Sequence, residues 1–180
     1  MKVNEIFYSL QGEGYHTGTP AVFVRFSGCN LRCPFCDTQH QSGTEMTHEQ
    51  IVDEVCRYGT RHVVLTGGEP TLQADDHLVE LLHLHGKFVQ IETNGTHPVP
   101  AGIDWITCSP KEGPYALSKV DELKVVYQNQ DVEAIAALFD ADHLMLQPCS
   151  CSNTTEVVEY VKRHPHWRMS LQTHKFIDIP

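Results

Sequence analysis

The chain lacks an excess of positive charge. It has 13 lysines and arginines against 23 aspartates and glutamates, which gives a formal net charge of −10 with histidine neutral. A groove for nucleic acid needs a basic face. This charge balance therefore argues against a nucleic-acid partner, and we expect none.

Long apolar runs are also missing. No stretch approaches the length needed to cross a bilayer, and the N-terminus has no basic segment followed by an apolar one of the kind that forms a secretion signal. From this we expect no membrane partner and a cytoplasmic location.

The sequence contains no internal repeat, low-complexity tract or linker. Its 180 residues and 41% hydrophobic content are ordinary for one globular unit with a substantial core. We therefore expect a single domain spanning residues 1–180.

Cysteine is present in an informative pattern. Of seven cysteines, Cys29, Cys33 and Cys36 form a C-x3-C-x2-C run on one short segment, from which they can converge on one metal centre. An odd, clustered set indicates metal binding rather than disulfides. A structural zinc site wants four closed ligands, whereas three cysteines leave one iron of a four-iron cluster open for a small molecule. A [4Fe-4S] cluster is favoured, with a non-catalytic zinc-binding module as the alternative.

The other cysteines carry weaker signals. Cys56 and Cys108 fall in an expected helix and strand and are interpreted as small buried apolar residues. Cys149 and Cys151 are only one residue apart and have no second pair, so we expect no auxiliary metal site there.

Hydrophobic patterning alternates strands with helices after the first two strands. A capping box at Thr47 and Gln50 predicts a helix that ends near Gly59. Strands are predicted at 3–9, 21–26, 62–65, 88–92, 105–108, 123–127, 143–147 and 169–172, and further helices at 75–85, 132–139 and 155–163. This order predicts an α/β fold with a mainly parallel sheet, and the length predicts a partial TIM-like barrel rather than a complete one.

A second motif lies downstream of the cysteines. The segment Leu65-Thr66-Gly67-Gly68-Glu69-Pro70 follows a predicted strand, its glycines allow close approach of the backbone to a ligand, and Glu69 offers a carboxylate to a cationic amine. Together with the cysteine run, which has the aromatic Phe35 directly before its third cysteine, this segment resembles the radical S-adenosylmethionine (radical SAM) enzymes.

Further segments narrow the resemblance to one family, the 7-carboxy-7-deazaguanine synthases, over residues 5 to the C-terminus. They are the runs at 8–14, 23–26, 36–38, 92–95, 109–111, 147–149 and 172–175. The resemblance implies that 6-carboxy-5,6,7,8-tetrahydropterin is converted to 7-carboxy-7-deazaguanine with loss of ammonia, in a queuosine-type pathway. It further implies that the reduced cluster cleaves SAM and that the 5′-deoxyadenosyl radical takes a hydrogen atom from C6 and later returns it.

The resemblance also implies the residues around SAM. Cys29, Cys33 and Cys36 would ligate the cluster. The SAM pocket would be formed by residues from the cluster loop, the glycine-rich motif and two later segments: Phe35, Cys36, Asp37, Gly68, Glu69, Ser109, Pro110, Lys111, Gln147, Pro148, Cys149 and Ser150.

The resemblance implies a substrate site made by Leu10, Gln11, Gly12, Glu13, Arg25, Thr66 and Pro180. Arg25 makes independent chemical sense, because a guanidinium can bind the substrate carboxylate through two hydrogen bonds. Its alternative is a surface salt bridge. Glu13 would accept hydrogen bonds from pterin N–H groups or be a solvated turn residue, and Pro180 would offer the terminal carboxylate.

Thr38 is implied to ligate Mg²⁺ that also holds the substrate, which suits a cation that shares oxygen ligands with substrate and water. The expected partners are the small pterin substrate, a flavodoxin- or ferredoxin-type reductant and a second copy in a homodimer. The rival enzyme is a glycyl-radical activating enzyme, which would use the same cluster loop on a protein partner without the Thr38 metal or the pterin pocket.

Overall fold

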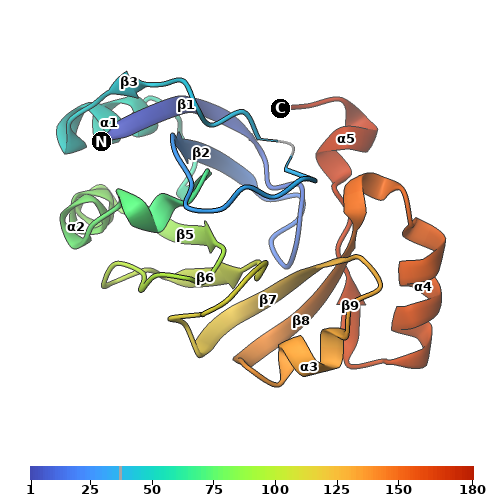
Figure 1. Ribbon diagram of the computed structural model, residues 1–180. Coiled ribbons are helices and arrows are strands. Elements are labelled where there is room, and N and C mark those ends of the chain that lie inside the picture. Colours follow the sequence, from blue (N-terminus) through green and yellow to red (C-terminus); the bar gives the residue numbers. More distant parts are fainter. Residues whose placement is uncertain (37) are drawn as a thin grey trace.

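The computed structural model describes residues 1–36 and 38–180 (Figure 1). The strands are β1 (Lys2–Leu10), β2 (Pro20–Phe26), β3 (Thr44–Glu45), β4 (His62–Gly67), β5 (Phe88–Thr93), β6 (Trp105–Cys108), β7 (Lys119–Tyr127), β8 (Asp140–Pro148) and β9 (Trp167–Met169). The helices are α1 (His48–Cys56), α2 (Asp76–Leu84), α3 (Val132–Ala136), α4 (Thr154–Arg163) and α5 (Thr173–Ile177), with short 3-10 turns η1 (Pro70–Leu72) and η2 (Cys149–Cys151).

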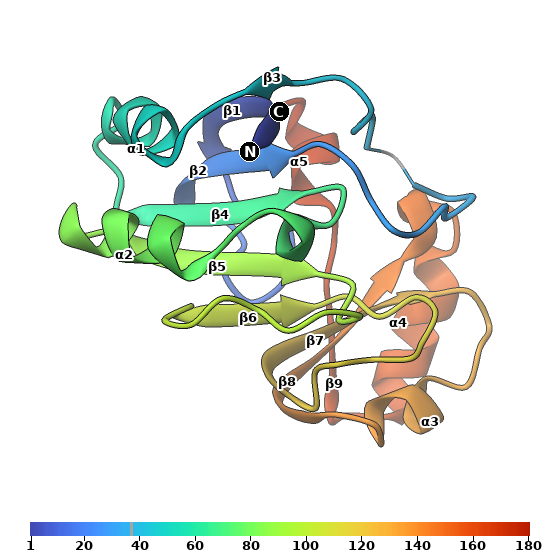
Figure 2. The same cartoon turned by 60° about the vertical axis from the view of Figure 1, so that its left-hand side comes forward.

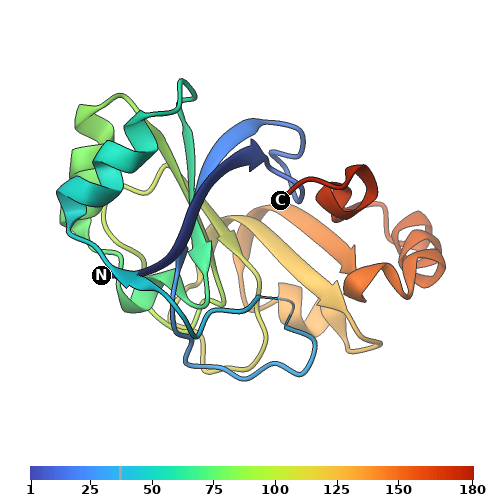
Figure 3. The same ribbon diagram turned by 90° about the horizontal axis from the view of Figure 1, so that it is seen from above.

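All nine strands form one sheet in the order β3-β1-β2-β4-β5-β6-β7-β8-β9. In this order, neighbouring strands from β2 through β4 to β9 are parallel. β1 runs antiparallel to β2, and β3 runs antiparallel to β1. The sheet curls, but its edge strands β3 and β9 do not pair within the described residues, so the barrel stays open (Figure 3). The predicted α/β fold with a partial barrel is confirmed.

Helices cover the convex side of the sheet. In Figure 2, α1 and α2 lie beside β2, β4 and β5, and α3 and α4 lie beside β7 to β9. The predicted capping box at Thr47 and Gln50 is present, and α1 turns Ile51, Val52 and Val55 into the core. Buried apolar side chains form one cluster under α1 and α2, one under α3 and α4, and a small third cluster of Ala21, Phe23 and Val64.

The concave side of the sheet is polar along β7. On β7, Leu123 and Val125 join the outer core, while the alternate residues Glu122 and Lys124 are also buried and face the inside of the barrel. Side chains alternate between the two faces of a strand, so this alternation of charge and hydrocarbon gives one polar and one apolar face. The interior of the barrel beside β7 is therefore built to hold polar groups.

The predicted end of the last strand and the predicted burial of Cys56 need correction. The last strand ends at Met169, not Gln172, because the chain turns inward there and Gln172 donates a hydrogen bond to Glu13. Residues 173–177 form the unpredicted helix α5. Cys56 is exposed because it lies on the solvent side of α1, whereas Cys108 is buried as expected. No helix in residues 1–36 and 38–180 has the length and apolar character to cross a bilayer.

Candidate active site

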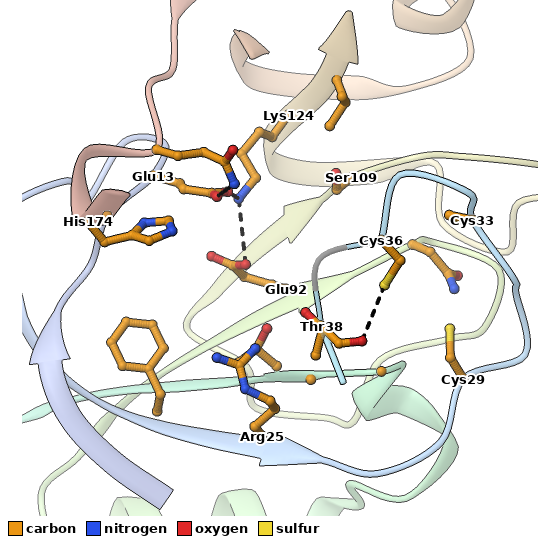
Figure 4. Close-up of a pocket in the computed structure, with 18 of the residues that line it drawn as sticks. Glu13, Arg25, Cys29, Cys33, Cys36, Thr38, Glu92, Ser109, Lys124 and His174 are labelled. Atoms are coloured by element: carbon orange, nitrogen blue, oxygen red, sulfur yellow. Dashed lines mark hydrogen bonds and ion pairs between the residues drawn. The ribbon is translucent and has the colours of Figure 1, made fainter. Parts of the chain in front are cut away.

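A cavity of about 860 Å³ opens at the carboxyl ends of the parallel strands. That is the end where barrels and open α/β sheets place their chemistry. Figure 4 shows its two parts: the three cysteines of the cluster loop lie toward one end, and Glu13, Arg25 and His174 lie toward the other. The cavity is lined by the predicted substrate residues Leu10, Gln11, Gly12, Glu13, Arg25, Thr66 and Pro180, and by most of the predicted cluster and SAM residues.

At the cluster end, Cys29, Cys33 and Cys36 follow β2 on one loop and all line the cavity. Their thiols are free of disulfides. Burial raises the pKa of the Cys29 and Cys33 thiols, and the nearby Lys111 ammonium partly offsets this at Cys33. Three soft sulfur donors on one cavity wall suit an iron–sulfur cluster with one open iron.

The thiols do not gather around one point. Among residues 1–36 and 38–180, no three side chains of His, Cys, Asp or Glu are placed to hold a single metal ion. The cysteines of a four-iron cluster bind different iron atoms, so they need not converge on one ion. The chemistry of the donors therefore fits the cluster.

Hydrogen bonds tie the cluster loop to the end of β5. Asn30 accepts from the Asn94 side chain at 3.0 Å and donates to the Thr96 hydroxyl at 2.9 Å. Gly68 lies directly against the loop, because a Cβ there would collide with the carbonyl oxygen of Gly28. Glycine at 68 is thus required by the close approach of two chain segments.

Glu69, predicted to offer its carboxylate to SAM, lines the cavity and also makes hydrogen bonds within the protein. Its side chain is buried, and its carboxylate accepts hydrogen bonds from the hydroxyls of Thr71 and Thr93, both at 2.6 Å, and from the Asn94 amide at 2.8 Å. These bonds link the ends of β4 and β5. Glu69 lines the cavity, but its oxygens already serve to fix the motif in place.

The remaining predicted SAM residues come from three elements. Lys111 donates to Ser109 at 2.7 Å and lies 5.6 Å from the centre of the Phe35 ring. Burial lowers the pKa of Lys111. Gln147, Pro148, Cys149 and Ser150 line the cavity from the end of β8 and η2. Pro110 is buried and does not line the cavity, and Asp37 lies outside the described residues.

Ser150 has a left-handed backbone conformation, with φ of 46°. Non-glycine residues adopt it at a cost, and they persist in it where surrounding contacts enforce it, often at functional sites. Here the Asn153 side chain accepts from the Cys149 amide at 2.8 Å and donates to the Tyr127 carbonyl at 2.9 Å. These bonds hold the η2 turn at the cavity wall.

At the substrate end, Arg25 projects from β2 beside Thr66 of β4, which is its partner in the sheet register. Its Nε donates to Glu5 at 2.7 Å, and its guanidinium lies 5.5 Å from the centre of the Phe7 ring. The salt bridge that was the alternative reading of Arg25 is thus present. It occupies Nε, and Arg25 lines the cavity all the same.

The connection between β1 and β2 folds into the barrel and meets the C-terminal segment. Gly12 accepts at its carbonyl from the Thr173 amide at 2.8 Å, and a Cβ at Gly12 would collide with the His174 ring. The Ser9 hydroxyl donates to the Pro180 main-chain oxygen at 2.8 Å. Figure 1 shows α5 and the C-terminus beside β1 and β2, so the last residues close one side of the cavity.

A buried ion pair lies at the floor of the cavity. Lys124 donates to Glu13 at 2.5 Å and pairs with Glu92 at 3.5 Å, and Gln11 donates to Glu92 at 2.8 Å. Glu13 is therefore no solvated turn residue. Burial pushes its pKa upward, but the Lys124 ammonium outweighs this and lowers the pKa to about 2.

Several cavity residues were not identified from the sequence alone. Glu92, Lys124 and His174 all line the cavity. For Lys124 a signal existed: charged residues at 122 and 124 alternate with Leu123 and Val125, which is typical of a strand with a polar buried face. The pairing of Asn30 with Asn94 joins positions 64 apart, and no local pattern reveals it.

Comparisons with known proteins agree with this geometry. Residues 23–147 match the model of the Radical SAM superfamily. A curated 7-carboxy-7-deazaguanine synthase of Bacteroides thetaiotaomicron is 63% identical over 179 residues, covering 99% of this chain and 98% of the relative. The chain belongs to the 7-carboxy-7-deazaguanine synthase family of radical SAM enzymes.

Other members of this family show the same correspondence. The synthase of Bordetella pertussis is 42% identical over 207 residues, covering 99% of this chain and 98% of the relative. The crystal structure of QueE from Escherichia coli aligns with a TM-score of 0.80 at 34% identity, covering 96% of this chain and 94% of that one. Membership of the radical SAM superfamily implies a [4Fe-4S] cluster and SAM, and the cysteine loop of this chain suits both.

Proposed function

We propose that this enzyme converts 6-carboxy-5,6,7,8-tetrahydropterin to 7-carboxy-7-deazaguanine with loss of ammonia, in a queuosine-type 7-deazapurine pathway. The observation that carries the proposal is one cavity whose walls hold the three-cysteine loop, a guanidinium at Arg25 and the carboxylates Glu13 and Glu92. The names of the full-length relatives support it.

Different residues of the cavity would hold the cluster, SAM and the substrate. When bound, the cluster and SAM supply the radical that begins the reaction. Cys29, Cys33 and Cys36 would hold the cluster, and the segments around Ser109 and Gln147 would hold SAM. Arg25 would bind the substrate carboxylate, while Glu13 would accept from the N–H groups of the aminopyrimidinone ring. Substrate is thereby oriented with one edge toward the cluster loop.

Closure of the site by α5 and the C-terminal residues would exclude water from the reacting centre. A dry cavity suppresses the side reactions of a reactive intermediate. A cavity of about 860 Å³ also lies within the usual range for a small-molecule site. This favours the pterin over the protein partner of an activating enzyme, and family membership favours the synthase over a zinc-binding module.

The test is direct. Anaerobically reconstituted protein is incubated with SAM, a reductant and the carboxypterin, and products are read by mass spectrometry. We expect 7-carboxy-7-deazaguanine and ammonia. Protein with a complete cluster that cleaves SAM but leaves the carboxypterin unchanged would contradict the proposal.

Magnesium belongs to the same proposal. Thr38 lines the cavity together with Arg25, so a cation on its hydroxyl would lie beside the substrate carboxylate. We expect Thr38→Ala to weaken the dependence of turnover on Mg²⁺, because one oxygen ligand is lost. Turnover is measured against Mg²⁺ concentration, with Thr17→Ala on the exposed β1–β2 connection as control. Superimposable curves for Thr38→Ala and the unmodified enzyme would refute the ligand role.

We also propose that the enzyme acts in the cytoplasm as a homodimer and takes its electrons from a flavodoxin- or ferredoxin-type protein. The open edges of the sheet at β3 and β9 support pairing between copies, since an exposed edge offers unpaired backbone groups. Sedimentation at micromolar concentration tests the dimer, and a monomer there would contradict it.

A further inference from the structure

Lys124 is a buried cation surrounded by acidic groups. Its side chain is only 4% exposed, and it pairs with Glu13 at 2.5 Å and Glu92 at 3.5 Å. Glu122 lies two residues earlier on the same face of β7 and is also buried. Figure 4 shows the Lys124 side chain between Glu13 and Glu92, which come from different elements.

Such a group is not required for folding as such. Buried ion pairs cost desolvation, and apolar residues of similar size often stabilise a fold as well or better. Lys124, Glu13 and Glu92 all line the cavity, whereas Glu122 does not. The network is therefore placed where it controls what the cavity presents to a ligand.

Each carboxylate is held from two sides. Glu13 accepts from Lys124 on one oxygen and from Gln172 on the other. Glu92 accepts from Gln11 on one oxygen and faces Lys124 with the other. A carboxylate oxygen can accept more than one hydrogen bond, so both groups keep capacity for a ligand while their orientation is fixed.

We propose that Lys124 is a positioning residue, which keeps Glu13 ionised and holds both Glu13 and Glu92 in place so that they accept hydrogen bonds from the N–H groups of the pterin ring. The proposal rests on the proposed function for the identity of the substrate. Lys124 acts through the two carboxylates and is not assigned a contact with the reacting atoms.

The direction of the charge coupling follows from the groups around Lys124, which are Glu13, Glu92, Glu122 and the more distant Lys111. Burial alone would lower the pKa of Lys124, but the three carboxylates raise it. Burial raises the pKa of Glu122, and Lys124 partly offsets this. With the pKa of Glu13 at about 2, its carboxylate stays ionised at any neutral or mildly acidic pH.

Lys124→Met removes the charge and keeps most of the side-chain volume. Without the Lys124 charge, burial raises the pKa of Glu13 and is opposed by the Gln172 and Gln147 hydrogen bonds, so Glu13 takes up a proton as pH falls. We expect carboxypterin binding to the reconstituted, SAM-loaded enzyme to weaken by about ten- to hundredfold at pH 6, and to recover as pH rises to about 8.5. Anaerobic calorimetry gives the dissociation constants.

The ratio of variant to unmodified dissociation constant isolates this effect, because ionisations of the substrate itself cancel. Lys119→Met, on the exposed start of the same strand, is the matched control and is expected to leave the ratio near one at every pH. Equal binding of Lys124→Met and unmodified enzyme would overturn the proposal. So would a loss by the same factor at every pH, which is the signature of a packing defect.

If Lys124→Met fails to fold, the double variant Lys124→Met with Glu122→Gln serves in its place. It also removes the charge of one of the three carboxylates that surround Lys124, and the same pH dependence is expected.

The outcomes distinguish failure of the proposed function from failure of the positioning role. Unmodified enzyme that binds the carboxypterin without converting it overturns the proposed function alone. Unmodified enzyme that converts it, with a pH-independent Lys124→Met, overturns the positioning role alone. No carboxypterin binding at all overturns both.

Discussion

At the scale of single residues, the cysteine loop and Arg25 determine what the cavity can hold. Arg25 lies in β2 just before its end, and the three cysteines follow that end. One strand therefore places both the cluster ligands and the expected carboxylate-binding group. Changes at these positions are expected to separate the two parts of the site.

Cys33→Ala is expected to lose both the cluster and all cleavage of SAM. Two thiolates remain, which are too few to hold a four-iron cluster with one open iron. Iron content and 5′-deoxyadenosine are measured after anaerobic reconstitution. Cys56→Ala, an exposed position on α1, is the control and should retain its iron. A full complement of iron in Cys33→Ala would contradict the cluster assignment.

Arg25→Ala is expected to weaken substrate binding and leave the cluster intact. A charge-assisted hydrogen bond contributes about 1.5–3 kcal/mol, so the apparent affinity should fall about ten- to hundredfold. Glu5→Gln removes the salt-bridge partner but keeps the guanidinium, and it should have a much smaller effect. Equal losses in the two variants would indicate that the salt bridge, rather than the guanidinium in the cavity, is what matters.

At the scale of elements, the site depends on where the ends of neighbouring strands meet. Glu69 and Asn94 join the ends of β4 and β5, and Asn94 in turn holds the cluster loop through Asn30. Gly68 lets β4 and this loop touch. The cysteine loop is thus fixed by its neighbours and not by its own sequence alone.

Gly68→Ala is expected to disturb the cluster loop, because the new Cβ would collide with the backbone oxygen of Gly28, which cannot move independently of Cys29. Overpacking of this kind typically costs about 1–3 kcal/mol. The denaturation midpoint and the iron content should both fall. Gly59→Ala is the control, since nothing lies within 4 Å of its Cβ position. Unchanged iron content in Gly68→Ala would show that the loop can retreat without losing its geometry.

At the scale of the whole molecule, hydrophobic alternation predicted the order of the main strands and the partial barrel. It succeeded because β4 contains a short apolar run, β5 alternates apolar with polar residues, and turn residues bound both strands. It failed at residues 169–172, where Gln172 leaves the sheet to bond Glu13, and it missed α5, which has no buried residue and so no apolar periodicity. Such features depend on contacts between distant segments.

The candidate site was predicted to a similar extent. Local motifs located the cluster loop, the glycine-rich motif and Arg25. The same motifs could not show that Glu69 is already hydrogen-bonded by Thr71, Thr93 and Asn94, or that Lys124 pairs with Glu13 across 111 positions. These pairings depend on the register of the sheet and on the fold of the β1–β2 connection. Neither can be predicted from local patterns in a single sequence.

Removal of residues 173–180 is expected to abolish substrate binding while the sheet and the cluster persist. The deleted segment carries the cavity residues His174, Lys175 and Pro180, but β9 ends before it and the cluster loop lies elsewhere. Circular dichroism, iron content and carboxypterin affinity are measured together. A shortened protein that binds the carboxypterin like the full chain would show that the C-terminal segment is not a wall of the site.

The meeting of Gly12 with Thr173, and of Ser9 with Pro180, also sets an order of events during synthesis. The chain emerges from the ribosome N-terminus first, so the cysteine loop appears early and residues 173–180, which form the last wall of the cavity, appear much later. A nascent chain therefore carries thiols that can take up iron before it has a place for the pterin. We therefore expect the substrate to bind only after residues 173–180 have been made.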